Sequence, residues 1–213
     1  MLVRLIKPLN GSSNCRVCNR TLERIEHFAY CPGMNDAFKP FITLVRAFNI
    51  QGPYDSALRL LGCVRSPTDD DNYITIPQGL FTTLLILWKF IILMLTEVDT
   101  HGAKFSSDRI WRLTCTRLAE RLNALRYSYQ LRLRKADLRG EPKPNPNKIS
   151  RHLAPLATIT ASGSFVYAQP FIDLMKHHLG DNLRLECDEP PTDLPTQPNY
   201  KPIQFVLEGS LPE

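Results

Sequence analysis

Half of the six cysteines in this chain lie in one stretch near the N-terminus, together with one of its five histidines. Cys15, Cys18, His27 and Cys31 follow the pattern C-x2-C-x8-H-x3-C. Two cysteines separated by two residues suit a tight turn that aims both thiolates at one ion. On a helix, His27 and Cys31 would share one face, one turn apart. The spacing predicts a structural Zn²⁺ site whose four protein ligands leave no open position for a substrate.

An alternative interpretation of the stretch is a CxxC redox pair, with His27 as an ordinary surface residue. Such a pair is typical of the start of a helix that follows a strand in a βαβ unit, and the sequence shows no such pattern. A tetrahedral, thiolate-rich ligand set disfavours magnesium and calcium, although it does not separate zinc from iron or copper. The pattern as a whole favours zinc.

The segment CRVCNRTLERIEHFAYCPGMNDAFKPFI resembles the zinc-binding region that follows the polymerase in non-LTR retrotransposon reverse transcriptases. That family shows a CxxC pair, a histidine in a context like ETxxHLFxxC, and a final cysteine followed by an apolar helix. Here ERIEHFAYC stands in that place, and the match covers about residues 10–50. The resemblance implies an all-helical module with Cys15, Cys18, His27 and Cys31 as metal ligands. It also implies nucleic acid (RNA or DNA) and other retroelement proteins as partners.

The chain departs from that family in its catalytic parts. The polymerase that should precede the module is absent from this sequence. Asp69, Asp70 and Asp71 follow Ser-Pro in a polar loop, whereas the paired aspartates of a polymerase lie in a hairpin between apolar strands. No nucleophile, base and orienting group are recognisable elsewhere in the sequence. We therefore expect a module that is not an enzyme.

Apolar periodicity predicts a mainly α fold class. Apolar residues recur at helical spacing over residues 38–48, where Asp36 would cap the helix, and residues 54–62 predict a second, short helix. A long helix is expected from Ser106 or Ser107 to Gly140. These segments give a zinc-binding helical domain over residues 1–140, with the zinc site at residues 10–35. A proline-rich C-terminal region, residues 141–213, should be partly disordered, with an extended linker at 141–148 and one helix near 168–180.

Residues 80–95, LFTTLLILWKFIILML, are apolar on nearly every face. A membrane span needs about 20 apolar residues and disfavours a charge at its centre. This run is shorter and carries Lys89 near its middle. We expect the buried central helix of a helical domain, and a membrane anchor over residues 79–98 is the alternative.

Positive charge gathers in residues 101–140, where ten lysines and arginines face three acidic residues. Arginines at such density can contact phosphates, and the candidate nucleic-acid-binding residues are Arg117, Arg121, Arg126, Arg132 and Arg134. The alternative is a solvated helix face whose arginine stems cover apolar surface. The net charge of the whole chain, +5, does not by itself argue for nucleic acid.

These patterns together predict a non-catalytic zinc-binding accessory module of a retroelement reverse transcriptase, which contacts nucleic acid through the zinc region and the arginine-rich helix. A zinc-stabilised protein–protein adaptor, in which the apolar 80–95 helix docks a partner, is the alternative. Cys63, Cys115 and Cys187 show no disulfide framework spacing, and the N-terminal apolar run is too short for a signal peptide. An intracellular location is therefore expected.

Overall fold

The computed structural model describes residues 14–52, 54, 56–66, 72–160, 162–186 and 204–205. Helices dominate these residues, and the predicted mainly α fold class is confirmed. The elements are α1 (Ile25–Tyr30), a 3-10 helix (Pro32–Met34), α2 (Asn35–Ala47), α3 (Ser56–Leu61), β1 (Cys63–Arg65), β2 (Tyr73–Thr75), α4 (Gln78–His101), α5 (Ser107–Arg139), α6 (Pro146–Leu153), β3 (Ala157–Ile159), β4 (Phe165–Tyr167), α7 (Gln169–Leu179), a second 3-10 helix (Gly180–Asn182) and β5 (Gln204–Phe205). The strands form two small antiparallel sheets, β1-β2-β5 and β3-β4.

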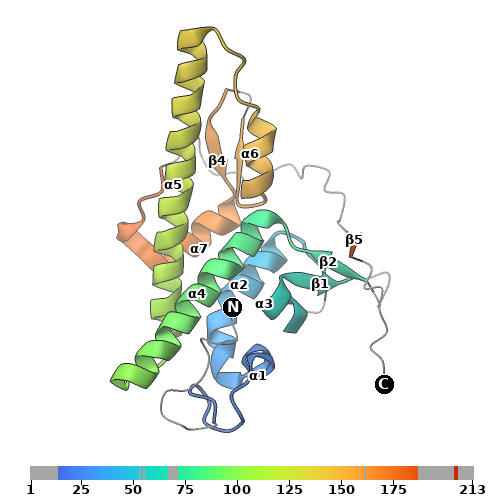
Figure 1. The fold of residues 1–213 in the computed structure, drawn as a ribbon, viewed down its shortest axis with the longest axis vertical. Helices are drawn as coiled ribbons and strands as arrows, with labels where there is room; N and C mark the ends of the chain where they lie inside the picture. Colours follow the sequence, from blue (N-terminus) through green and yellow to red (C-terminus); the bar gives the residue numbers. More distant parts are fainter. Residues whose placement is uncertain are drawn as a thin grey trace.

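The two longest helices, α4 and α5, pack against each other and organise the rest of the fold (Figure 1). Helices α2 and α7 pack on α5, and α6 packs on α4. The indole of Trp111 on α5 is buried, and its Nε1 donates a hydrogen bond to the Ala37 carbonyl oxygen of α2 at 2.7 Å. A single core cluster runs from Cys15 to Met175 through all of these helices.

Helix α4 covers the segment that was expected to be a buried central helix, and about half of its apolar stretch is buried. Leu80, Leu84, Leu87 and Ile91 are almost fully buried, whereas the Lys89 side chain lies at the surface. Among the described residues, α4 alone is long and apolar enough to cross a membrane, and half of its most apolar 18-residue window is buried inside the structure. A core helix meets the same criteria of length and composition.

Local capping signals set both ends of α5, but not the start of α2. The Ser106 hydroxyl accepts a hydrogen bond from the Arg109 amide at the start of α5, and Gly140 ends the helix with a φ of 63°, as expected. At α2 the expected cap is wrong, because the chain enters the helix directly from the 3-10 turn Pro32–Met34. Asp36 therefore lies in the first turn of α2 and does not cap it.

Residues 146–182 fold back onto α4 and α5. Helix α6 begins inside the predicted extended linker, because Pro146 occupies the first helical position and the Asn145 side chain accepts from the Asn147 amide. The Gly79 amide of α4 donates to the Ala154 carbonyl at 2.9 Å. A Cβ atom at Gly79 would lie 2.4 Å from the Leu153 carbonyl oxygen, so the two backbones meet here only because residue 79 is glycine. The expected helix near 168–180 is present as α7.

Two predictions fall outside the described residues and stay predictions. The acidic turn at Asp69, Asp70 and Asp71 is one of them. The other is disorder of the proline-rich tail at residues 187–203 and 206–213.

His178 on α7 is a buried imidazole between α7 and α5. Its ring stacks on Trp111 at 5.4 Å, only 7% of its side chain is exposed, and neither ring nitrogen has a hydrogen-bond partner among the described residues. Burial, together with the neighbouring His177 charge, lowers the pKa of His178, and Asp108 at 4.0 Å opposes that shift only in part. The folded state therefore binds a proton at His178 less readily than the unfolded chain does.

We expect acidification to destabilise the chain through His178. The stabilising effect of neutral His178 is complete above the unfolded pKa, about 6.5, and is lost as the pH falls below it. Between pH 7 and pH 5, His178→Phe should lose fewer degrees of Tm than the parent chain. The control is His101→Gln, which changes an exposed histidine. An equal decrease in Tm between pH 7 and pH 5 for the parent and His178→Phe would contradict the expectation.

Candidate metal centre

A tight turn over residues 14–22 presents the first two cysteines. Asn14 and Leu22 form an isolated antiparallel bridge, the Cys15 amide donates to the Thr21 carbonyl at 2.7 Å, and the Asn19 amide donates to the Cys15 carbonyl at 2.7 Å. Asn19 has a φ of 53°, a left-handed conformation in which asparagine is enriched. The turn thereby holds Cys15 and Cys18 close together.

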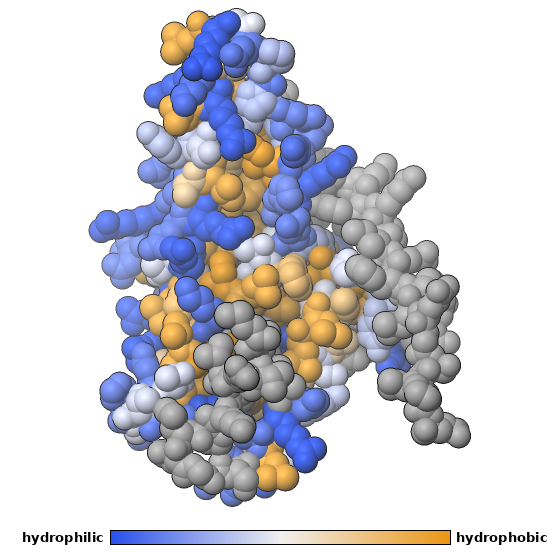
Figure 2. Space-filling model, in the orientation of Figure 1, coloured by the Kyte–Doolittle hydropathy of each residue, from blue (hydrophilic) through white to orange (hydrophobic). Residues whose placement is uncertain are grey.

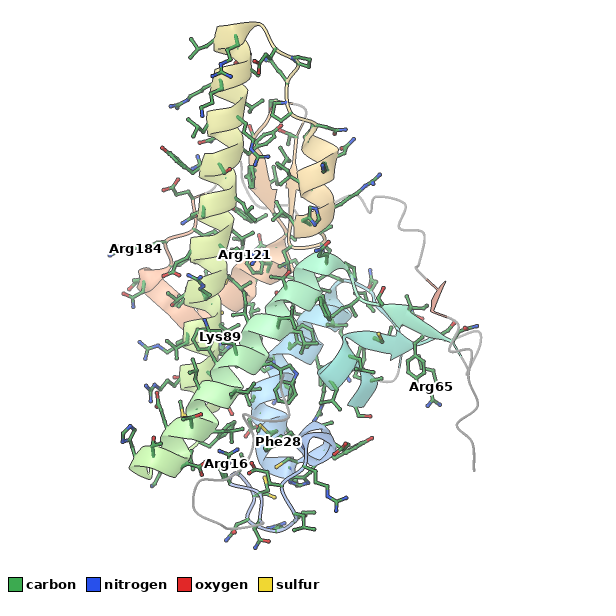
Figure 3. All side chains as sticks on the ribbon, in the orientation of Figure 1. Arg16, Phe28, Arg65, Lys89, Arg121 and Arg184 are labelled. Atoms are coloured by element: carbon green, nitrogen blue, oxygen red, sulfur yellow. The ribbon has the colours of Figure 1, made fainter. Side chains whose placement is uncertain are left out.

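Helix α1 and the residue after it supply the other two side chains. His27 lies within α1, and Cys31 follows the helix directly, where the backbone has already left helical geometry (φ −58°, ψ 120°). Phe28 is completely buried and fixes α1 to the core. Figure 3 shows yellow sulfur atoms gathered beside the labelled Arg16 and Phe28.

The four predicted ligand residues lie together. Their donor atoms all lie within 4.8 Å of one another, with the Cys15 and Cys31 Sγ atoms 3.8 Å apart and Cys18 Sγ 3.3 Å from His27 Nε2. A tetrahedral ion with bonds of about 2.3 Å to sulfur and 2.0–2.1 Å to nitrogen separates two sulfurs by about 3.8 Å, and sulfur from nitrogen by about 3.5 Å. The cluster could therefore hold a metal ion with little rearrangement.

Proton affinities in the cluster differ strongly among the three thiols. Burial raises the pKa of Cys15, and burial followed by the Cys15 charge raises the pKa of Cys31 to about 12. Burial also opposes ionisation of Cys18, but hydrogen bonds from the Arg20 amide and His27 outweigh it and lower the pKa of Cys18 to about 7. Thiolates are the form that binds metal, so metal binding here should release protons and weaken at low pH.

Arg16, between the two turn cysteines, fixes the turn to the C-terminal part of α4. Its guanidinium donates to both Glu23 carboxylate oxygens at 2.5–2.9 Å, pairs with Asp99, and donates to the Leu95 carbonyl. The side chains of Arg16, Glu23 and Asp99 are 8%, 1% and 6% exposed, respectively. Burial opposes the charge of Arg16, but Glu23 and then Asp99 outweigh it and raise its pKa. The ligand turn is therefore positioned by a buried ion triad.

No family model, curated protein or solved structure matches this chain. Support for the metal centre comes from the four-ligand spacing and from the geometry of the cluster.

The five candidate nucleic-acid-binding arginines do not share one face of α5. At about 100° per residue, Arg117, Arg121 and Arg132 fall within about 60° of one another, whereas Arg126 lies about 180° from Arg117. Arg134 lies about 100° from Arg117 around the helix axis, in the direction opposite to Arg121 and Arg132. Arg117 pairs with Glu120 at 2.9 Å, and Arg126, which is mostly buried, pairs with Glu186. Arg121 and Arg132 line a pocket between α4, α5 and α6.

A second group of arginines, not predicted as a site from the sequence, lies on another flank of α5. Arg109, Arg112 and Arg184 line a groove of about 910 Å³ between α5 and the end of α7. Arg109 pairs with Glu97, whereas Arg112 and Arg184 make no ion pair among the described residues. Charge density on α5 indicated Arg109 and Arg112, but only the fold brings Arg184 beside them.

We expect the purified chain to carry one metal ion per molecule, because four ligand atoms converge on one point. Cys18→Ser should remove the ion or weaken its binding strongly, and Cys115→Ser should not, because Cys115 lies in the core outside the cluster. Elemental analysis of both variants measures this. Equal metal content in the parent and Cys18→Ser would contradict the site.

Proposed function

We propose that the chain is a non-catalytic helical module built on one structural zinc ion, bound by Cys15, Cys18, His27 and Cys31. The observation that carries this proposal is the convergence of three sulfur atoms and one imidazole nitrogen at tetrahedral spacing. Four protein ligands complete the coordination of zinc, which suits a structural role. The free cysteines recorded among the described residues fit a reducing, intracellular location.

We further propose that the module contacts nucleic acid as an accessory region of a retroelement reverse transcriptase. The spacing of the metal ligands and the context of His27 support the retroelement origin, and the density of arginine on α5 supports contact with phosphates. Arg121, Arg132 and Arg134 are exposed and make no ion pair among the described residues, so they remain available to a polyanion. Arg117 and Arg126 already have carboxylate partners.

Salt dependence of binding to a single-stranded oligonucleotide tests the nucleic-acid proposal. Each phosphate contact should contribute about −0.7 to the slope of log affinity against log salt. The double variant Arg121→Gln/Arg132→Gln should flatten that slope by about 1.4 and weaken all sequences alike. Arg117→Gln/Arg126→Gln, which changes two paired arginines, should change it less. A lack of binding at low salt would refute nucleic-acid contact while leaving the metal centre untouched.

A protein–protein adaptor is the second candidate, and exposed apolar side chains favour it. Phe81, Leu85 and Leu93 on α4 and Leu61 on α3 are exposed large hydrophobic residues. Figure 2 shows hydrophobic atoms across the middle of the molecule, over α4 and beside α3. Apolar surface of this kind is typical of contact sites. Metal binding without nucleic-acid binding at low salt would favour the adaptor.

A further inference from the structure

A pocket lies between the start of α4, the middle of α5 and the second half of α6. Its volume is about 200 Å³. The floor is apolar and comes from three segments: Leu118, Leu122 and Leu125 of α5, Ile149 and Leu153 of α6, and Leu156. Figure 2 shows hydrophobic atoms between two hydrophilic ridges in this part of the molecule. The pocket can therefore accept an apolar group from solvent.

Two positively charged side chains flank this apolar floor and have no acidic partner among the described residues. Arg121 and Arg132 line the pocket, are exposed, and make no ion pair among the described residues. Figure 3 labels Arg121 on the part of α5 beside the start of α4. Gln78 and Gly79 at the start of α4 also line the pocket, but the Gly79 amide is already bonded to the Ala154 carbonyl oxygen, so the two arginines are the groups available to an anion.

The remaining polar groups of the pocket are neutral or already engaged. His152 Nδ1 lies 2.8 Å from the Gln78 side-chain oxygen, and the Tyr129 hydroxyl, which is almost fully buried, donates to the Pro144 carbonyl at 3.5 Å. The residues that line the pocket include no aspartate or glutamate. Charge and polarity thus favour a ligand with a negative head and an apolar body.

We propose that this pocket binds an amphipathic anion with one unbranched alkyl chain. The anionic head pairs with Arg121, and the alkyl chain lies along the leucine floor towards Arg132. A cavity of about 200 Å³ leaves room for an alkyl chain of several carbons. This site is separate from the metal centre, and it shares Arg121 and Arg132 with the proposed nucleic-acid contact without depending on that contact.

Binding of sodium octanoate to the full chain, below its micelle concentration, tests the proposal by calorimetry and by amide NMR shifts. Saturable binding of one octanoate should shift the amides of Gly79 and of α5 near Arg121. From butanoate to octanoate, affinity should rise about fourfold per methylene, because each carbon removes apolar surface from water. The gain per methylene should level off once the chain is longer than the pocket.

Substitutions of single arginines separate the contribution of the anionic head group to affinity from that of the alkyl chain. Arg121→Gln should weaken octanoate about tenfold or more, because it removes a charge-assisted hydrogen bond. Arg132→Gln should have a smaller effect. Arg134→Gln is the matched control, because it removes an exposed α5 arginine outside the pocket and should leave affinity within about twofold. Octanol, which has the chain without the charge, should bind more weakly than octanoate.

Several outcomes would overturn the proposal. One is unchanged affinity in Arg121→Gln, measured on a variant whose circular dichroism and Tm match those of the parent. Others are equal binding of acetate and octanoate, which would indicate an anion site only, and binding to anionic vesicles without saturable binding of monomeric octanoate. Octyl phosphate binding in the same pocket as octanoate would support the site and show that the head-group chemistry is shared.

Discussion

Removal of the metal from the loaded chain is expected to abolish amide protection around His27 and to reduce it along α2, while α4 near Trp88 keeps its protection. A structural zinc site contributes its binding free energy to folding, and apparent values reach about 10–16 kcal/mol in small zinc peptides. The loss should spread because Cys15, Phe28 and Cys31 belong to the same buried cluster as Phe38 and Phe41 of α2.

Hydrogen exchange with and without a chelator measures this effect. Helix α4 is the internal reference, because its buried leucines pack mainly on α5 and do not need the ion. Cys18→Ser without chelator should reproduce the exchange pattern of the chelated parent. Equal protection around His27 in loaded and chelated protein would show that the turn and α1 are stable without metal, and a structural role for the ion would be lost.

Loss of the buried Arg16 charge is expected to have the second large effect. Arg16→Met leaves the Glu23 and Asp99 carboxylates buried without their cation, which costs about 3–5 kcal/mol. For a chain of this length that corresponds to a decrease in Tm of roughly 6–20 °C. Metal affinity should also fall, by roughly 10- to 100-fold, because Arg16 positions the turn that carries two ligands.

Arg20→Met is the matched control for Arg16→Met. Arg20 lies in the same turn but is exposed, so its replacement should change stability by less than about 0.5 kcal/mol. Asp99→Asn tests the far end of the triad, since it keeps the shape of the side chain and removes one charge. A Tm for Arg16→Met within about 2 °C of the parent value would show that the triad contributes little.

Elements with local signals were predictable from the sequence. Each of these signals depends on residues within one or two turns of each other. They are the apolar run in α4, the Ser106 cap and the terminal Gly140 of α5, and the periodicity of α2. The metal cluster was predictable for the same reason, because its ligands span only seventeen positions. Helix α6 was missed because three prolines in EPKPNPNK suggested extended chain, although Pro146 after Asn145 is also a helix start.

Features that join distant segments were not predictable. Arg16 and Asp99 are 83 positions apart, and no periodicity or spacing connects them. The pocket needs α4, α5 and α6 together, so its floor cannot be recognised in any one segment. The orientation of the arginines along α5 was accessible from helical periodicity alone, but which of them form ion pairs depends on residues as distant as Glu186.

The close backbone approach at Gly79 has a consequence for shortened forms of this chain. The amide of Gly79 depends on the carbonyl of Ala154 as its acceptor, and the segment after α5 covers buried leucines of the long helices, because α6 packs on α4 and α7 packs on α5. Truncation after residue 140 would strip that cover and leave the first turn of α4 without its partner. The shortened polypeptide should then self-associate through the bared leucines, and restoring the segment through Leu179 should return it to solution.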